Sequence, residues 1–408
     1  MVVRFVQLSD LHLGAAFGAL PGARRADRRR TQRTVLDRVV QLAIERGAQG
    51  ILIPGDLFDA EGADLETIAS AVHAFQRDGC PPVFLAPGNH DPFHARSRYW
   101  NPRLLAASGF AWPEHVCVFG SPGWTGVELD DIPVTVWGRC FMSGVETFER
   151  PLAPAALSQL HLNPDRAHVA VFHGSRERTC PPSQKITAPF SDDEVRHSPF
   201  TYLAAGHYHV RSEIAAGDGE PGRGVRLAYA GSATALKADE LGAHGALEVR
   251  LSLDEPAPWV ETEFLELDPV RVRALEVDVT GLPTADAIEQ RAAERIEAEG
   301  YGNQDAVTLR LVGRLGRGIR AHELGGGLQS RVYALRIVHG SLRPDYDLEA
   351  MRAGEPETVE ERFARTLLDQ LDAERDPEQR ALVSHALYYG LDALTSGAVV
   401  PAYEDLDA

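Results

Sequence analysis

Five short segments between positions 10 and 209 place metal-binding side chains directly after an apolar, strand-like run. The segments are Asp10-Leu11-His12, Gly55-Asp56, Gly88-Asn89-His90-Asp91, His173-Gly174 and Gly206-His207-Tyr208-His209. The runs before them, at residues 2–8, 50–53, 82–86, 168–172 and 202–205, have the β-branched, aromatic and alanine character of buried strands. In open α/β sheets, sites form outside the carboxyl ends of the strands. The pattern therefore predicts an α/β fold whose metal ligands collect at one sheet edge.

The donor types in these segments fit a pair of divalent cations. A two-metal centre has its ions roughly 3.5–4 Å apart, and a shared carboxylate can bridge them. The expected ligands of one ion are Asp10, His12, Asp56 and His209, and those of the other are Asp56, Asn89, His173 and His207, with Asp56 as the bridge. None of the segments contains cysteine, so the set favours Mn, Fe, Mg or Zn in an expanded shell over a thiolate zinc site. A lone Gly-Asp or histidine is more often a turn or core residue, but five such segments in this order are not.

This series resembles the calcineurin-like metallophosphoesterases, whose pattern of DxH, GD, GNH, H and GHxH it matches over roughly the first 250 residues. Residues 7–14, 55–59 and 229–232 resemble the SbcD branch, and within it a bacterial subgroup called YhaO-like. Members of that branch are nuclease subunits that work with an SMC-like ATPase in the repair of DNA ends. The resemblance implies a two-sheet sandwich flanked by helices, a DNA substrate and an ATPase partner, and we expect Mn as the metal.

Two further residues are expected to act in catalysis. Two cations would neutralise a phosphodiester and lower the pKa of a bridging water, so that hydroxide could attack phosphorus. His90 has no metal role and is expected to stabilise the transition state or to protonate the departing sugar oxygen. Asp59 would accept a hydrogen bond from the His90 ring and favour its protonated form. The alternative for Asp59 is the N-cap of a helix over residues 65–75.

The position of Asp59 also departs from part of the resembled family. Archaeal and eukaryotic relatives carry a histidine there, to which a role in the exonuclease reaction has been given. An aspartate at this position is similar to the arrangement in protein phosphatases. The balance of exonuclease and endonuclease activity therefore stays open.

The distribution of charge matters more than its sum. The net charge of −18 argues at first against DNA, because nucleic-acid binders usually present a basic surface. Much of the acidity lies in residues 345–408, which carry sixteen acidic residues against five arginines. Residues 22–38 and 310–343, in contrast, each carry seven arginines. The residues expected to bind DNA phosphates are Arg24, Arg25, Arg28, Arg29, Arg314, Arg317 and Arg320. The alternative for residues 22–38 is a solvated helix face, and the alternative for the loop within residues 310–343 is an ordinary surface loop.

Beyond the phosphoesterase core, which we place at residues 1–255, the pattern of elements changes. Prolines between residues 251 and 269 indicate a connector. Strands over 271–279, 306–312 and 331–338, a helix over 284–299 and a glycine-rich loop over 313–327 predict a small α/β domain at 265–345. By resemblance this is a capping domain that holds DNA over the metals. Two amphipathic helices over 359–374 and 377–394 predict a helical segment at 355–400, which in the resembled family binds the ATPase. A hairpin packed on its own chain, or on a second copy, is the alternative.

The remaining features bear on location and assembly. Cys80, Cys117, Cys140 and Cys180 show no paired spacing, so free thiols are expected. The chain shows no signal peptide or long apolar stretch, and we expect a cytoplasmic protein with no membrane contact. Helical stretches over 64–75 and 102–108 are candidates for a homodimer surface.

Together these patterns predict a metal-dependent DNA nuclease, an exonuclease or endonuclease that serves as the nuclease subunit of a double-strand-break repair complex. Two alternatives stay open. The same centre could hydrolyse a small phosphate ester, although the C-terminal third and its basic loop argue against this. The chain could instead be a scaffold for an ATPase, although the complete ligand set argues against that.

Overall fold

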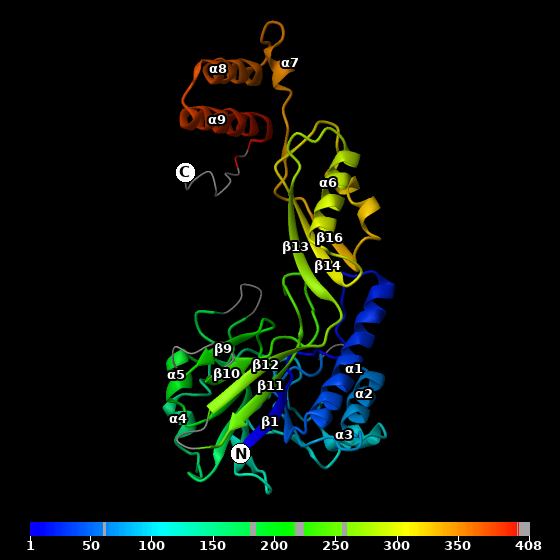
Figure 1. Ribbon diagram of the computed structural model, residues 1–408, viewed down its shortest axis with the longest axis vertical. Helices are drawn as coiled ribbons and strands as arrows, with labels where there is room; N and C mark the ends of the chain where they lie inside the picture. The colour runs from blue at the N-terminus through cyan, green and yellow to red at the C-terminus, as the bar shows by residue number, and fades with distance from the viewer. Residues whose placement is uncertain (60–62, 180–184, 217–223, 255–258, 398, 400–408) are drawn as a thin grey trace. The chain divides into compact units, whose positions relative to one another are not determined.

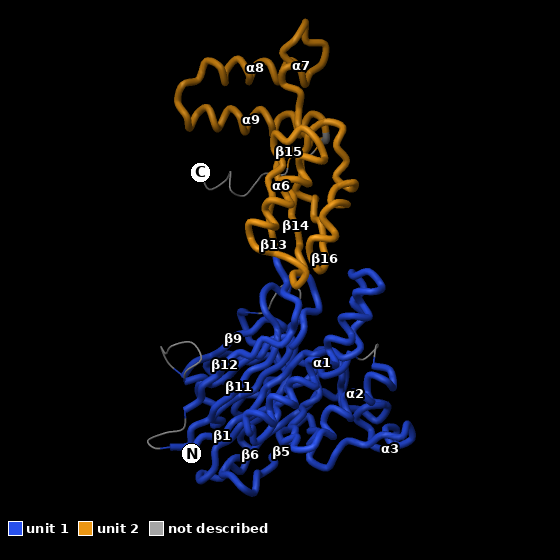
Figure 2. Tube along the Cα trace, turned by 45° about the vertical axis from the view of Figure 1, so that its right-hand side comes forward, with its two compact units in different colours: residues 1–273 blue, residues 274–408 orange. Residues whose placement is uncertain are grey.

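The computed structural model describes residues 1–59, 63–179, 185–216, 224–254, 259–397 and 399. The chain divides into two compact units, Met1–Arg273 and Ala274–Ala408 (Figure 2). The division falls later than the connector expected at 251–269, because residues 259–266 of this segment form a strand of a sheet in the first unit. Cys180, Pro256 and Pro258 lie outside the described residues.

The first sheet of unit 1 has six strands in the order β12-β11-β1-β2-β3-β4. These are β12 (Trp259–Glu266), β11 (Gly245–Ser252), β1 (Val2–Gln7), β2 (Gly50–Ile53), β3 (Val83–Leu85) and β4 (Val116–Val118). Strands β1 to β4 are parallel to one another, whereas β11 and β12 run antiparallel to their neighbours. Every residue of β2 and β3 is buried, as expected of parallel strands covered on both faces.

The second sheet of unit 1 also has six strands, in the order β5-β6-β7-β8-β10-β9. These are β5 (Thr125–Glu128), β6 (Val134–Gly138), β7 (Ala167–His173), β8 (Tyr202–Gly206), β10 (Val225–Tyr229) and β9 (Ser212–Ala215). The four central strands are parallel, and the two edge strands are antiparallel.

The two sheets pack face to face, and helices cover their outer faces (Figure 1). Side chains of β1 alternate between the two layers. Val3 and Phe5 join the core between the sheets, while Val6 joins the core under the helices. The helices on the first sheet are α1 (Gly22–Glu45), α2 (Leu65–Phe75) and α3 (Pro102–Ala107), and those beside the second are α4 (Pro154–Leu157) and α5 (Asp192–His197). The predicted two-sheet α/β sandwich is therefore confirmed.

A small sheet and one long helix form the first part of unit 2. The sheet has the order β13-β14-β16. Its elements are β13 (Arg271–Asp278), α6 (Ala285–Ala298), β14 (Asp305–Val312) and β16 (Ala334–Val338), and a second short ladder pairs β15 (Arg314–Leu315) with β17 (Arg343–Pro344). Ile288 and Ile296 of α6 pack on Val307 and Leu309 of β14. The strand expected over 331–338 begins only at Ala334, because the chain before it forms 3-10 turns at η1 (Ala321–Glu323) and η2 (Gly326–Leu328).

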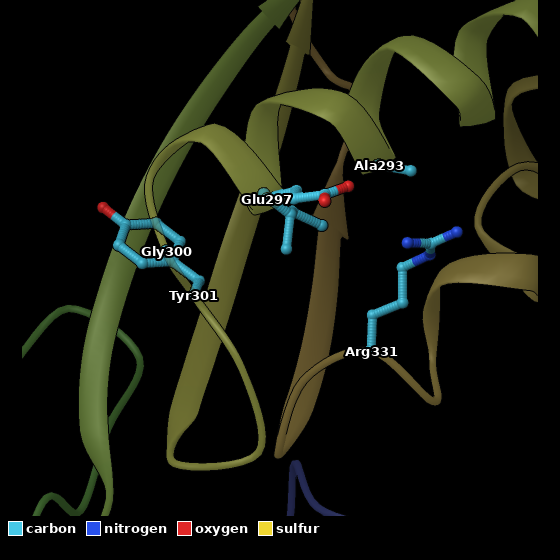
Figure 3. A pocket seen from close by; sticks show the side chains of 6 residues that line it. Ala293, Glu297, Gly300, Tyr301 and Arg331 are labelled. Atoms are coloured by element: carbon cyan, nitrogen blue, oxygen red, sulfur yellow. The ribbon is translucent and has the colours of Figure 1, made fainter.

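One side of α6 borders a pocket of about 410 Å³ (Figure 3). Its lining residues are Ala293, Ile296, Glu297, Gly300, Tyr301 and Arg331. None of the residues predicted to act in a site lies among them.

Three helices complete unit 2: α7 (Leu348–Arg352), α8 (Val359–Ala373) and α9 (Pro377–Ser396). Thr358 and Glu361 form a capping box at the start of α8, and Asp376 caps α9 with Pro377 in its first turn. The helices α8 and α9 approach closely at Gly390, where a Cβ would lie 2.0 Å from the Phe363 ring. Among the described helices, none is long and apolar enough to cross a membrane. The three described cysteines, Cys80, Cys117 and Cys140, are free as expected.

Arg28 was expected to contact DNA, but the structure buries it. Its side chain is only 2% exposed, and both terminal nitrogens donate to the carboxylate of Asp268, at 2.7 and 2.6 Å. One of them also donates to the carbonyl of Ala235. This guanidinium is buried and its nitrogens are already hydrogen-bonded. Arg28 therefore joins α1 to the segment after β12 and is not available to bind a phosphate.

The first prediction concerns this buried ion pair. Replacement of one partner leaves the other as an uncompensated buried charge, so Arg28→Met should lower the free energy of unfolding by about 3–5 kcal/mol. Urea unfolding measures the loss. The matched control is Arg30→Met, which breaks an exposed pair with Asp27 and should leave stability close to that of the wild type. Equal unfolding midpoints for the two variants would show that the buried pair of Arg28 and Asp268 does not stabilise the fold.

Candidate metal centre

The structure brings the seven predicted ligands together from both sheets of unit 1. Asp10 and His12 follow β1, Asp56 follows β2 and Asn89 follows β3, while His173 ends β7 and His207 and His209 follow β8. All five strands are parallel within their sheets, so their carboxyl ends lie at one edge of each sheet. A hydrogen bond of 3.0 Å between the His173 ring and the Pro54 carbonyl joins the two edges.

Asp56 lies between the two halves of the cluster. Its Oδ2 is 3.6 Å from Nε2 of His12 and 3.3 Å from Nε2 of His173. Ligand atoms of Asp10, His12 and His209 all lie within 4.8 Å of one another, as do those of Asp10, Asp56 and His173. Asp56 therefore lies where a carboxylate that bridges two cations would have to lie, between the ligands of one ion and those of the other.

The second half of the cluster converges on His173. Its Nε2 lies 2.9 Å from Oδ1 of Asn89 and 3.3 Å from Nδ1 of His207. The other nitrogen of each ring is already committed, since Nδ1 of His173 contacts the Pro54 carbonyl and Nε2 of His207 contacts the Lys185 carbonyl at 2.7 Å. A ring N–H that donates to a fixed carbonyl leaves the lone pair of the opposite nitrogen for a cation.

The chemistry of these donors fits divalent cations. Carboxylate oxygens, an amide oxygen and ring nitrogens point their lone pairs at the same small volume, where they repel one another unless positive charge lies between them. In the described part of the chain, Nε2 of His12 is buried without a hydrogen-bond partner. A buried polar atom left without a partner costs free energy, and a cation would satisfy it. Oxygen and imidazole ligands suit Mn, Fe, Mg and Zn.

Burial and neighbouring charges shift the pKa values of three of these ligands. Burial lowers the pKa of His173, but the carboxylates of Asp56 and Asp10 outweigh it and raise the pKa to about 9. Burial raises the pKa of Asp10 to about 6. Burial and the neighbouring His173 lower the pKa of His207 to about 4, so this ring is neutral and ready to act as a ligand at neutral pH.

Four of the seven residues adopt a backbone conformation that ordinary side chains avoid. The φ angles of Asp10, His12, Asp56 and His207 are 51°, 48°, 53° and 107°. Such conformations cost about 1–3 kcal/mol each and persist only where the surroundings enforce them. Here the loops hold one another, because the His12 N–H donates to the Asp56 carbonyl at 3.0 Å and the His207 N–H donates to the Asp10 carboxylate at 3.0 Å.

Asp91 is a supporting residue that received no role from the sequence, although its segment was singled out. Its buried carboxylate accepts backbone N–H groups of Gly88, Leu57 and Asp56 at 2.7, 2.9 and 3.2 Å. It thereby fastens the loop after β3 to the loop after β2. The two loops are so close that a Cβ on Gly88 would lie 2.3 Å from Oδ1 of Asp56.

Glu240 is a second residue that the sequence did not reveal. It is 5% exposed, and its Oε1 lies 2.6 Å from Nδ1 of His209. Its Oε2 accepts hydrogen bonds from the hydroxyl of Ser232 and the N–H of Leu236. A carboxylate that holds one ring nitrogen orients the ring and leaves Nε2 for the metal. The nearest sequence signal was Ser232, in one of the stretches that resemble the SbcD branch.

The two predicted catalytic residues do not form the expected hydrogen-bonded pair in the described part of the chain. His90 is exposed at the edge of the cluster, with its ring centroid 4.6 Å from that of His12 and its N–H donating to Oδ1 of Asp56 at 2.8 Å. Among the described residues, His90 makes no hydrogen bond with Asp59. Asp59 is not the N-cap of α2 either, because Asp64 fills that position and accepts from the Thr67 N–H at 2.8 Å.

The arginines expected to bind DNA fall into two groups. Arg24, Arg25 and Arg29 are exposed in the first two turns of α1. In unit 2, Arg317 and Arg320 are exposed and pair with Asp347 and Glu323.

The expectation for Arg314 was wrong. It is 8% exposed, its guanidinium donates to both carboxylate oxygens of Asp392 at 3.2 Å, and it lies 4.0 Å from the Tyr388 ring centroid. This arginine joins β15 to α9, and its buried guanidinium is not accessible to the phosphates of DNA.

The second prediction tests Glu240. Glu240→Gln keeps the size of the side chain but weakens its hold on His209, so affinity for Mn²⁺ should fall about 10–100-fold. Titration of the metal-free protein, followed by the electron paramagnetic resonance signal of free Mn²⁺, measures this affinity. Asp239→Asn, a charge removal at the exposed neighbour, is the control and should bind as the wild type does. Unchanged affinity in Glu240→Gln would show that the carboxylate does not position the ligand.

Comparison with known proteins agrees with this geometry. The family model described as calcineurin-like phosphoesterase matches residues 3–211. The chain is 24% identical over 383 residues to the uncharacterized metallophosphoesterase YhaO of Bacillus subtilis, covering 92% of this chain and 82% of that protein. It is 23% identical over 276 residues to the DNA double-strand break repair protein Mre11 of Saccharolobus solfataricus, covering 62% of each.

Among solved structures, TT1561 of Thermus thermophilus aligns with a TM-score of 0.38 at 16% identity, over 65% of this chain and 99% of that one. The family match spans just over half of the chain and includes all seven candidate ligands. This chain is a metallophosphoesterase and belongs to the calcineurin-like phosphoesterase family.

Proposed function

We propose that this chain is a DNA nuclease of the SbcD type, which hydrolyses phosphodiester bonds with a pair of Mn²⁺ ions. The observation that carries the proposal is the paired donor cluster around Asp56, with the exposed His90 at its edge. The similarity to a DNA double-strand break repair protein supports DNA as the substrate. Unit 2, which a small phosphate ester would not need, also supports it.

The chemistry divides between the metals and the chain. Two divalent cations supply, when bound, neutralisation of the phosphate charge and a water of lowered pKa. The chain holds the donors in place through its strained loops and through the contacts of the His173 and His207 rings with backbone carbonyls. The exposed His90 ring has a nitrogen within 4.8 Å of ligand atoms of His12 and Asp56, and can donate a proton to the departing sugar oxygen as the phosphorus–oxygen bond breaks.

The proposal extends to partners. We place the protein in the cytoplasm, as the nuclease subunit of a complex that repairs double-strand breaks. An SMC-like ATPase would bind the helices α8 and α9, where Val359 and Leu382 are 65% and 61% exposed. A second copy would bind through α2 and α3, on which Leu65 and Leu104 are exposed. Arg24, Arg25 and Arg29 would contact DNA phosphates.

The third prediction tests substrate and metal together. With Mn²⁺, the purified chain should cleave linear duplex, hairpin or single-stranded DNA with a higher kcat/KM than bis(p-nitrophenyl) phosphate, and a chelator should stop both reactions. Asp56→Asn should lose both reactions and most of its bound metal, measured by elemental analysis, because this carboxylate contacts both halves of the site. Asp59→Asn is the matched control and should retain its metal.

Two outcomes would count against this prediction. Hydrolysis of the small diester without any cleavage of DNA would make the chain a small-substrate phosphoesterase. Retention of two ions in Asp56→Asn would exclude Asp56 as the bridge.

The fourth prediction separates His90 from the ligands. His90→Asn should keep its metals but lose about 10²–10⁴-fold in kcat on DNA, the usual scale of general acid catalysis. The same variant should lose little on bis(p-nitrophenyl) phosphate, because p-nitrophenolate leaves without a proton. Equal losses on both substrates would show that His90 stabilises charge at phosphorus and is not the acid.

A further inference from the structure

Five large apolar side chains are exposed on loops around the metal centre, and we call them the apolar rim. Its members are Met142, Val145, Phe148, Ile186 and Val210, which are 44%, 68%, 75%, 50% and 52% exposed. Single exposed apolar residues are ordinary on protein surfaces, whereas a group around a functional site marks a binding surface. The loops that carry the rim follow β6, β7 and β8, the last two of which also deliver metal ligands.

The loop after β6 is built against the ligands of the second cation. The Phe141 N–H donates to the Pro87 carbonyl at 2.9 Å, and the Phe141 carbonyl accepts from the Phe93 N–H at 2.7 Å. The Phe141 ring packs edge-on against the His173 ring, with centroids 5.6 Å apart. A Cβ on Gly144 would lie 3.1 Å from the Asn89 carbonyl oxygen. Met142 and Val145 therefore lie on a loop that touches two predicted ligands.

The other loops connect to the same place. The Ala188 N–H donates to the Thr147 carbonyl at 2.6 Å, which joins the segment of Ile186 to that of Phe148. An ion pair between Lys185 and Glu146 joins the same two segments, and the Lys185 carbonyl contacts the His207 ring. Val210 directly follows His209. Four of the five rim residues thus lie on two hydrogen-bonded loops beside the metal centre, and Val210 adjoins the ligand His209 in the sequence.

The position of the apolar rim beside the metal centre determines which part of a DNA substrate it would contact. A phosphate held at the metals fixes the nucleotides on either side of it, and nucleotides of one strand are about 3.4 Å apart along a duplex. Their sugars and bases would therefore lie beside the loops that contact Asn89, His173 and His207. Bases without a pairing partner expose flat apolar faces, which stack on aromatic side chains in a sequence-tolerant way. Phe148 provides such a ring, and the four aliphatic side chains provide apolar contact around it.

We propose that the apolar rim is a nucleobase-binding site for the unpaired bases next to the phosphate at the metal centre. The inference rests on the proposed nuclease function and adds to it a substrate class: single-stranded DNA, or duplex ends that have frayed. A closed duplex hides the faces of its bases and gains nothing from the rim.

The fifth prediction uses variants of the rim and substrates that lack bases. The variants are Phe148→Ser and Val145→Ser, and the control is Val2→Ser, at the end of β1 opposite to Asp10. The substrates are a single-stranded oligonucleotide and one with the same backbone whose three terminal nucleotides at each end are abasic. With Mn²⁺, Phe148→Ser should lower kcat/KM about 5- to 100-fold on the first substrate and leave the abasic substrate unaffected. Val145→Ser should act in the same direction with a smaller loss, and Val2→Ser should change neither.

Every outcome of this experiment bears on the proposal. Equal losses on both oligonucleotides would mean that the rim supports the loops and does not bind bases, and unchanged rates on both would mean that DNA does not cross it; either overturns the inference. Metal content and circular dichroism verify that each variant retains its site and fold. If the wild type hydrolyses bis(p-nitrophenyl) phosphate but cleaves neither oligonucleotide, the proposed nuclease function itself has failed.

Discussion

A buried negative charge held between two histidine rings is the interaction on which the site depends. Asp56 lies within 3.6 Å of a ring nitrogen from each sheet, His12 from the first and His173 from the second. Burial of a carboxylate is costly unless positive charge compensates it. The strained loops, the four backbone hydrogen bonds of Asp91 and the contact of Glu240 with His209 all act to keep lone pairs converging on this point.

The sandwich could be predicted from the sequence because its signals are local. Val3, Phe5 and Val6 alternate between two cores, and strands buried on both faces appear as continuous apolar runs. The rule that parallel strands end at the same edge predicted the gathering of the donors within each sheet, but the donors come from two sheet edges and not from one. The structure adds what such a rule does not contain, namely the carbonyl contacts of the His173 and His207 rings and the positive φ of four donors.

Other features depend on distant contacts and had no local signal. Glu240 is 31 residues from His209 and follows no recognised spacing. Arg28 and Arg314 were taken as surface charges because a sequence shows charge but not burial, and both lie in buried ion pairs. Asp59 and Asp64 both precede α2, and only the side chain of Asp64 reaches the free N–H of the first turn.

The ion pair between Arg314 and Asp392 joins two segments of unit 2 that are 78 residues apart in the sequence. Arg314 begins the short strand β15 directly after β14, and its guanidinium is enclosed by Asp392, Tyr388 and Tyr346. The hydroxyl of Tyr346 also donates to Asp392, so this carboxylate is held by both Arg314 and Tyr346. The ion pair therefore attaches α9 to the short strand that follows β14, independently of the path of the intervening chain.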